Sequence, residues 1–377
     1  MRESRIHLSP PHLGTEELEF VKEAFEANWV APAGPHIHAF EEELAVYLGI
    51  NHCAVLNSGT AAIHLALVIL GVRKDDEIIC SSFTFSGSCN PVAYQGAIPI
   101  FVDSEMESWN MDPELLEETI LDRIRKGKKP KAIITVHLYG MPCRIVEIMK
   151  IAKKFDIPVI EDAAEALGSR YKEQMLGTFG EFGIISFNGN KIITTSGGGA
   201  LVSRRPEWIQ KAKFLSTQAR DPAPHYQHSE IGYNYRLGNI CAGIGRGQLK
   251  IIEDRISRRR ANFDFYQHQL ADLTGIAFQP ERKGNYSNRW LTCITVDPSE
   301  NNGVTGEKIR LALEENNIES RPLWKPMHLQ PVFGGMPFYG SKVSERLFES
   351  GLCLPSGSSL SEENLHRIVS VVKQQFE

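Results

Sequence analysis

Residues 186–200 read SFNGNKIITTSGGGA, and they place Lys191 between two apolar runs, 183–187 and 200–203, each typical of a β-strand. Small hydroxyl and glycine residues surround the lysine and would let a ligand approach the backbone closely. An amine that is partly desolvated in a pocket has a lowered pKa and becomes a nucleophile toward an aldehyde or ketone. A turn lysine closing a hairpin through residues 197–199 fits the same pattern, so this stretch alone leaves both interpretations open.

The composition is that of an ordinary globular protein. The 377 residues are 42% hydrophobic and 23% charged, with a formal net charge of -5, which gives no reason to expect a nucleic-acid partner. The basic run 123–131 contains no aromatic residue to stack on a base, which favours a solvated loop. Residues 1–14 lack the apolar core of a signal peptide and no run is long enough to span a bilayer, so we expect a cytoplasmic protein without a membrane partner.

The seven cysteines are scattered and never adopt the C-x-x-C spacing of a zinc or redox site. They are interpreted as reduced thiols, and no metal site is expected.

A phosphate-binding turn is predicted near residue 58. The apolar run 52–56 is followed by Ser58, Gly59 and Thr60 and then by the helical pattern 61–67. A strand, a tight turn and a helix N-terminus point free N–H groups at one place, and the two hydroxyls add donors. A capped helix after a strand is common, so this motif is only suggestive by itself.

Further strand-like runs, at 77–80, 98–103, 132–137 and 158–162, alternate with helical patterns. Such alternation indicates an α/β domain with a mainly parallel sheet, whose functional residues gather beyond the strand C-termini. Two strand ends carry chemistry: Asp162 and Glu165 lie in EDAAE, and Phe85 lies in SFTFS.

The ends of the chain carry other elements. A helix is expected from Thr15, with Leu18, Val21, Phe25 and Trp29 spaced to share one face. A long helix is expected over 241–273, and short strands and helices after Gly275 indicate a smaller α/β domain. The predicted boundaries are 1–250 for a large domain with an N-terminal arm and 251–377 for a small domain.

A pyridoxal phosphate enzyme needs four groups. These are a reactive lysine, a phosphate-binding turn, a carboxylate at a strand end and an aromatic ring that stacks on the cofactor. The sequence resembles the DegT/DnrJ/EryC1/StrS sugar aminotransferases, within the fold type I pyridoxal phosphate enzymes, from about Ile6 to the C-terminal helix. The motifs that carry the resemblance are NWVAPAGP, NSGTAAIHLAL, TVHLYGMP, EDAAEALGS, SFNGNKIITTSGGG and GYNYRLGN. It implies a large pyridoxal phosphate domain with a mainly parallel seven-stranded sheet and a smaller C-terminal α/β domain.

The resemblance also implies roles for individual residues. Lys191 would be the Schiff-base lysine and Asp162 the partner of the pyridinium nitrogen. The other implied cofactor contacts are Ser58, Gly59, Thr60 and Ser186 at the phosphate, Phe85 on the ring, Glu165, Asn188, and Asn234 from a neighbouring subunit, which implies a homodimer with shared active sites. Glu165 stands where many members have glutamine facing the ring hydroxyl, and a carboxylate there must share or borrow a proton.

The reaction implied by the resemblance is amino transfer from L-glutamate to a nucleotide-linked keto-sugar. The variant looks most like the enzymes that aminate C4 of UDP-4-keto-6-deoxy-N-acetylglucosamine in bacillosamine-type pathways. The expected contacts to this substrate are Trp29 and Pro32 in the N-terminal loop and Arg321, Trp324, Lys325 and His328 in the C-terminal part.

Several alternatives remain open at this point. The substrate could be a dTDP- or GDP-linked sugar aminated at C3 or C4, and a non-catalytic ligand sensor with the same fold is a further possibility. Dehydratase relatives replace the lysine with histidine, so Lys191 argues against that chemistry. A nucleotide-binding protein with a phosphate loop at 197–199 is a weak alternative, because the sequence has no G-x-x-x-x-G-K-[ST] motif.

Overall fold

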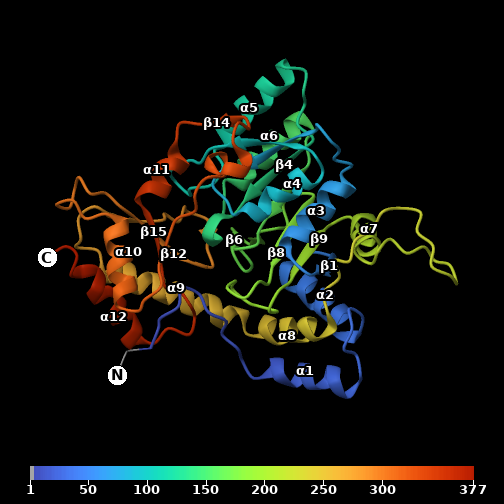
Figure 1. Cartoon of the computed structure of the whole chain (residues 1–377), viewed down its shortest axis with the longest axis horizontal. Helices are drawn as coiled ribbons and strands as arrows, with labels where there is room; N and C mark the ends of the chain where they lie inside the picture. Colours follow the sequence, from blue (N-terminus) through green and yellow to red (C-terminus); the bar gives the residue numbers. More distant parts are fainter. Residues whose placement is uncertain (1–3) are drawn as a thin grey trace.

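The computed structural model describes residues 4–377 and has a central eight-stranded sheet (Figure 1). In spatial order the strands are β1 (His52–Leu56), β9 (Gly199–Ser203), β8 (Phe182–Ser186), β5 (Val159–Asp162), β4 (Ala132–Val136), β2 (Glu77–Ser81), β3 (Ile98–Val102) and β14 (Phe338–Tyr339). The six strands from β8 to β14 are parallel, whereas β9 is antiparallel to both β8 and β1. The predicted α/β fold with a mainly parallel sheet is confirmed, although the sheet has eight strands rather than seven because β14 joins its edge.

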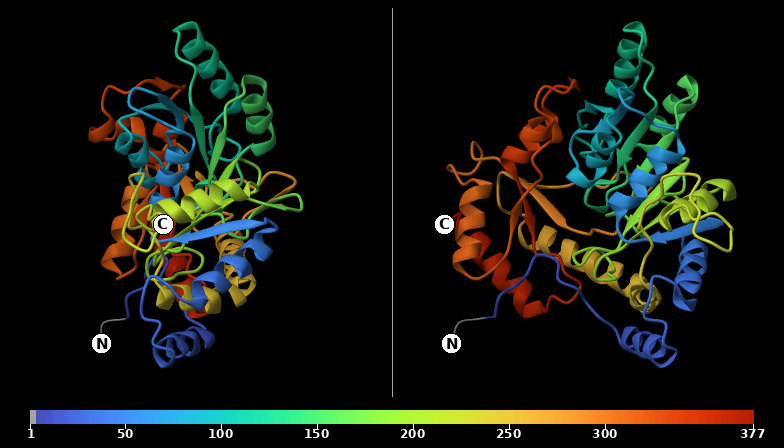
Figure 2. Two further views of the ribbon diagram at one scale, coloured as in Figure 1. Left: turned by 90° about the vertical axis from the view of Figure 1, so that its right-hand side faces the viewer. Right: turned by 45° about the vertical axis from the view of Figure 1, so that its right-hand side comes forward.

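Helices cover both faces of this sheet, because its strands are apolar on both sides. On one face lie α3 (Gly59–Ile69), α4 (Asn90–Tyr94) and α7 (Pro206–Ser216). On the other lie α2 (Pro35–Leu48), α5 (Pro113–Arg125) and α6 (Ile145–Phe155), and Figure 2 shows α5 and α6 side by side at one end of the molecule. Alternation along β2 shows the pattern: Ile78 and Cys80 pack on the first face and Ile79 on the second.

A second sheet lies in the C-terminal part, to the left in Figure 1. It consists of β10 (Ile276–Phe278), β12 (Thr292–Val296), β15 (Gly351–Leu354) and β13 (Arg321–Pro322), and α10 (Gly306–Glu315) and α12 (Glu362–Lys373) pack against it. The helix α11 (Val343–Ser350) follows β14, which joins the edge of the large sheet. The C-terminal part thus contributes to both sheets, and the boundary at residue 250 stays a prediction. A third sheet joins segments of both parts: β6 (Arg170–Tyr171) and β7 (Gln174–Met175) stand between β5 and β8 in sequence, and β11 (Asn285–Tyr286), which pairs with β6, stands between β10 and β12.

The long helix expected over 241–273 is interrupted. Two helices stand there, α8 (Asn239–Lys250) and α9 (Ile252–Gln269), with Ile251 between them. Three glycines of α8 allow its close packing: a Cβ on Gly245 would lie 2.6 Å from the Phe40 ring and one on Gly247 2.8 Å from the backbone of Glu17. The prediction of one continuous helix is wrong. Helix α8 packs on the N-terminal helices, whereas α9 packs on the C-terminal sheet that contains β12 and β15.

The helix α1 (Glu16–Glu26) packs against α8, but not through the predicted residues. It buries Phe20 and Ala24, whereas Leu18 and Phe25 are 60% and 61% exposed. Leu18 and Phe25 therefore face away from the body of this chain, Val21 is half-buried, and Trp29 lies beyond the end of the helix. Among residues 4–377 no helix is long and apolar enough to cross a membrane.

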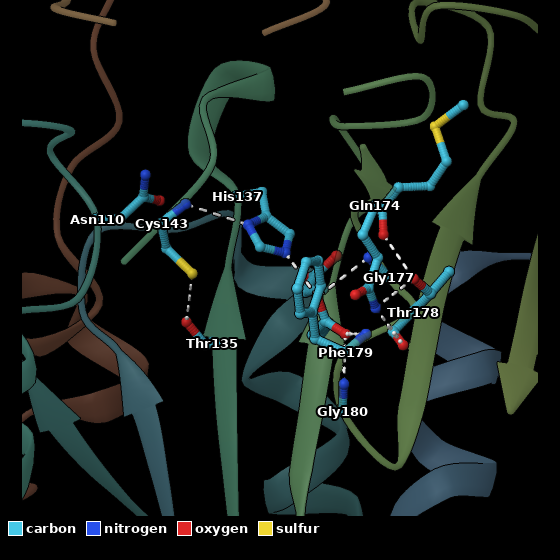
Figure 3. Close-up of polar contacts among 12 residues, drawn as sticks. Asn110, Thr135, His137, Cys143, Gln174, Gly177, Thr178, Phe179 and Gly180 are labelled. Carbon is cyan, nitrogen blue, oxygen red and sulfur yellow. Dashed lines mark hydrogen bonds and ion pairs between the residues drawn. The ribbon is translucent and has the colours of Figure 1, made fainter. Parts of the chain in front are cut away.

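Glu161, the residue before Asp162 in β5, is fully buried and fixes the turn that leads into β8. Its Oε1 accepts N–H groups of Phe179 and Gly180, both at 2.6 Å, and its Oε2 accepts the N–H of Gly177 at 3.1 Å. The His137 ring at the end of β4 contacts Oε2 at 3.1 Å through Nε2 (Figure 3). This network ties together the ends of the strands that flank Asp162.

We expect Glu161→Gln to lower the free energy of unfolding by about 3 kcal/mol, because the new amide NH2 would face backbone donors in a fully buried site. Urea unfolding measures the effect as a lower midpoint at unchanged slope. Glu173→Gln, at an exposed position of the neighbouring turn, should leave the midpoint in place. A Glu161 variant as stable as the parent would contradict this account of the network.

Candidate active site

A cavity of about 820 Å³ opens where β4, β5 and β8 end, and it brings most of the predicted site residues together. Those that line it are Ser58, Gly59, Thr60, Phe85, Asp162, Glu165, Ser186, Asn188, Lys191, Arg321 and Trp324. The location agrees with the rule that ligands of parallel α/β sheets bind beyond the carboxyl ends of the strands.

One wall of the cavity is the N-terminus of α3. Ser58 caps this helix by accepting the Ala61 N–H at 3.0 Å, and Gly59 and Thr60 occupy the first turn. Strand β9 approaches the turn so closely that a Cβ on Gly199 would lie 2.4 Å from the backbone nitrogen of Gly59. The glycine next to the lysine loop thus shapes the predicted phosphate cradle, whose free N–H groups and helix dipole favour an anion.

Lys191 lies in the loop that joins the antiparallel strands β8 and β9. The lysine therefore belongs both to a hairpin loop and to the lining of the cavity. Its Nζ is 3.2 Å from Oε1 of Glu165 and 4.1 Å from the centroid of the Trp290 ring. The side chain is only 11% exposed, so the amine is largely shielded from water.

Glu165 is buried beside the lysine. Burial raises the pKa of its carboxyl to about 7, while the Lys191 ammonium and the Tyr139 N–H oppose this rise and the nearby Asp162 carboxylate adds to it. The Tyr139 N–H donates to Oε2 at 2.6 Å. The sequence-based expectation that a carboxylate here must share or borrow a proton fits this environment.

Asp162 ends β5, lines the cavity and is 6% exposed. Its Oδ2 accepts the Ser88 hydroxyl at 2.6 Å, and its Oδ1 accepts the Ala164 N–H at 3.1 Å. The Ser88 hydroxyl also contacts Thr84 Oγ1 at 2.7 Å. Since Asp162 has no cationic partner among these contacts, it is suited to face a cationic group of a ligand.

The structure adds residues that the sequence did not indicate, above all Trp290. Its Nε1–H donates to the Asn190 carbonyl at 2.7 Å, and the Ser9 hydroxyl donates to the same oxygen, also at 2.7 Å. Arg259 holds both of these donors: its guanidinium contacts the Trp290 carbonyl at 2.5 Å and the Ser9 hydroxyl at 3.0 Å. The peptide before Lys191 is thereby fixed by the N-terminal segment and the C-terminal part of the chain.

We expect Trp290→Phe to keep an aromatic face under Nζ but to remove the hydrogen bond to the Asn190 carbonyl. The free energy of unfolding should fall by about 1 kcal/mol, the usual net value of one such bond. Because the lysine loop then shifts, amine transfer should slow by roughly tenfold or more. Steady-state kinetics measure the rate and urea unfolding measures the stability, with Trp208→Phe in α7 as the control. An unaltered rate in Trp290→Phe would contradict a positioning role for Trp290.

Other predicted residues lie outside the cavity of this chain. Asn234 is exposed, and its carbonyl accepts the Asn57 side-chain N–H at 3.3 Å. Trp29, 46% exposed, and Pro32 lie in the loop before α2. Lys325 lines a smaller neighbouring cavity of about 310 Å³, which shares Phe85 and Trp324 with the main one.

His328 is buried away from the main cavity. Its Nδ1 contacts the Ser82 hydroxyl at 2.6 Å, its Nε2 contacts Glu345 at 3.2 Å, and its ring stacks on Phe338. Because both ring nitrogens are engaged within the fold, the structure does not present His328 to a substrate.

The cavity fits pyridoxal 5'-phosphate. A helix N-terminus free of side chains stands at Gly59 for the phosphate, Lys191 supplies a shielded amine for the aldehyde, and Asp162 supplies a buried carboxylate for the ring nitrogen. These three groups line one space, which is the arrangement that the cofactor requires.

Comparisons with known proteins agree with this chemistry. The DegT/DnrJ/EryC1/StrS aminotransferase family matches residues 11–373. The candidate pyridoxal phosphate-dependent aminotransferase EpsN of Bacillus subtilis is 50% identical over 99% of this chain and 96% of its own length. GDP-perosamine synthase of Escherichia coli O157:H7 is 36% identical over 98% of both chains. The pyridoxal phosphate form of Spr1654 of Streptococcus pneumoniae, a candidate sugar aminotransferase, superposes with a TM-score of 0.89 at 27% identity, covering 99% of this chain and 100% of the other.

The match spans almost the whole chain, and the relatives' chemistry is the chemistry that the cavity supports. The protein is a pyridoxal phosphate-dependent nucleotide-sugar aminotransferase and belongs to the DegT/DnrJ/EryC1/StrS aminotransferase family.

Proposed function

We propose that the enzyme transfers the amino group of L-glutamate to the C4 keto group of UDP-4-keto-6-deoxy-N-acetylglucosamine. The products are a UDP-linked 4-amino-4,6-dideoxy sugar and 2-oxoglutarate. The observation that carries the amino-transfer step is the shielded Lys191 amine in one cavity with Asp162 and the α3 N-terminus. The choice of the UDP sugar rests on the motif variant SFNGNKIITTSGGG with GYNYRLGN.

The bound cofactor supplies an aldehyde and an electron sink. In this proposal Lys191 would hold the cofactor and its amine would take up and give back the substrate proton, while Asp162 would keep the ring nitrogen charged. Ser58, Gly59, Thr60 and Ser186 bind the phosphate, and Phe85, Asn188 and Glu165 complete the contacts to the ring and its linkage.

The sugar nucleotide would enter at the side where Arg321 and Trp324 line the cavity. Arg321 is 67% exposed and pairs with Glu319 at 2.9 Å, so its guanidinium can turn to a diphosphate at little cost. The Trp324 ring lies 5.5 Å from the Phe85 ring, and both rings line the two cavities, whereas Lys325 lines the smaller one. Aromatic faces and a cation suit a base and a phosphate.

A homodimer with shared active sites completes the proposal. Asn234 is exposed and lies outside the cavity of its own chain, as a residue serving a neighbouring subunit would. The loop beyond α7, which precedes Asn234, projects from the body (Figure 1) and exposes Tyr226 and Ile231, and the outer face of α1 exposes Leu18 and Phe25. Contacts of Trp29 and Pro32 with the substrate would likewise require a second copy.

The test is to incubate the loaded enzyme with L-glutamate and one of three sugars: the UDP-linked sugar, a GDP-linked or a dTDP-linked 4-keto-6-deoxy sugar. Mass spectrometry identifies the aminated product and a coupled assay measures 2-oxoglutarate. Highest kcat/KM with the UDP sugar supports the proposal, whereas a preference for the GDP- or dTDP-linked sugar, or turnover of none of the three, overturns it. Mixing Lys191→Ala with Asn234→Ala protein should restore part of the activity if sites are shared, and mass measurement in solution should give a dimer.

A further inference from the structure

Lys191 and Glu165 form an ion pair inside the cavity that is largely shielded from solvent. The Nζ and Oε1 atoms are 3.2 Å apart, and the side chains are 11% and 4% exposed. The other carboxylate oxygen, Oε2, is taken by the Tyr139 N–H at 2.6 Å, so only Oε1 is directed at the amine. The Trp290 ring covers Nζ at 4.1 Å. Among residues 4–377, Oε1 of Glu165 is therefore the acceptor directly beside Nζ for a proton that leaves it.

We propose that Glu165 is a further catalytic residue, which takes a proton from Nζ of Lys191 and later returns it. In the forward step an N–H bond of the ammonium breaks and an O–H bond forms at Oε1, so the ion pair becomes a neutral amine beside a neutral carboxylic acid. The net charge of the pair does not change, and no co-reactant is needed. The reverse step follows when the amine has collected a proton from the substrate.

The reason for such an exchange lies in what the lysine must do. A lysine amine in water is protonated at neutral pH, and a protonated amine cannot act as a base. A carboxylate held at hydrogen-bond distance can accept the proton without exchange with solvent, whereas a glutamine at this position could not. Glu165 would thus give this enzyme a proton acceptor of its own beside the lysine.

The charges around Glu165 bring its proton affinity into the required range. Burial raises its pKa to about 7, Lys191 opposes this rise, and Asp162 in β5 adds to it. The Tyr139 phenol and the Cys293 thiol of β12 also face this carboxyl, and the pKa values of both are raised by burial, so both stay neutral near pH 7. The carboxyl is therefore protonated below about pH 7 and ionised above it.

The first experiment is an infrared titration, without any sugar, of the enzyme loaded with the amino form of the cofactor, pyridoxamine 5'-phosphate, which leaves the Lys191 amine free to pair with Glu165. We expect a carboxylic-acid C=O band that disappears as the pH rises through about 7 in the native enzyme and is absent from Glu165→Gln. Lys191→Ala should move this transition to higher pH, because the ammonium no longer stabilises the carboxylate. Glu319→Gln, whose carboxyl also lines the cavity but pairs with Arg321, should leave the transition in place.

The second experiment is the pH dependence of the single-turnover reaction with L-glutamate, followed by absorption. The native rate should fall below about pH 7, where Oε1 already carries a proton. Glu165→Gln should lose this fall and be slower at high pH by about 10²-fold, the lower range for a positioned acid–base group. A native enzyme without the infrared transition, or a Glu165→Gln variant with the same pH–rate profile, overturns the proposal.

The inference rests on the aminotransferase chemistry in the proposed function but not on the sugar. If the sugar assignment fails, the infrared and single-turnover results are unaffected. If glutamate is not the donor, the infrared titration still decides.

Discussion

Lys191→Ala is expected to abolish amino transfer, with a fall in rate of more than about 10⁴-fold, at the upper end of what a positioned acid–base group contributes. The lysine has two tasks in the proposed reaction, since it holds the cofactor and carries the proton. Among the described residues that line the cavity there is no second lysine, and the other basic side chains there are Arg321 and His7. Neither of these can replace a neutral primary amine.

Absorption spectra before and after adding L-glutamate measure this effect directly. The native enzyme should show the visible band of the lysine-linked cofactor and lose it with glutamate, while Lys191→Ala should lack this band and form no 2-oxoglutarate. Lys191→Arg keeps the charge beside Glu165 without a nucleophilic amine and should be equally inactive. Lys172→Ala, on an exposed turn, should behave as the native enzyme does. A Lys191→Ala rate within tenfold of the native rate would falsify the assignment of this residue.

The parts of the site that could be predicted from the sequence are those with a local signal. Ser58, Gly59 and Thr60 stand between a strand and a helix, and Asp162 ends an apolar run, so the order of the elements alone predicts where they meet. The stretch around Lys191 is ambiguous because its signal is only local. A hairpin turn and a pocket look alike in sequence, and here Lys191 belongs to both.

The parts that could not be predicted depend on contacts between distant segments. Trp290 and Asn190 are 100 residues apart, and nothing near Trp290 in the sequence indicates that its indole will donate to the lysine loop. Ser9 is similar, since an ordinary serine becomes a site residue only because Arg259 lies beside it. His328 shows the converse error: a histidine in a promising run is held by Ser82 and Glu345 inside the fold.

The environment of Asp162 favours an effect on chemistry rather than on folding. Asparagine has the same shape, so Asp162→Asn can still accept the Ala164 N–H, and its amide can donate to the Ser88 hydroxyl, which then donates to Thr84. The midpoint of urea unfolding should therefore change little. What disappears is the negative charge that, in the proposed function, faces the ring nitrogen of the cofactor.

We therefore expect Asp162→Asn to slow the single-turnover reaction with L-glutamate by about 10³-fold, a loss comparable to that of a preorganised electrostatic contact. Cofactor affinity should fall as well, measured by equilibrium dialysis. Ser88→Ala is the matched control: it removes one hydrogen bond to Oδ2 but leaves the charge, so its effect should stay within about tenfold, the value of a single hydrogen bond to a charged group. If both variants were slowed equally, the orientation of Asp162 rather than its charge would be the important property, and the proposed pairing with the ring nitrogen would lose its support.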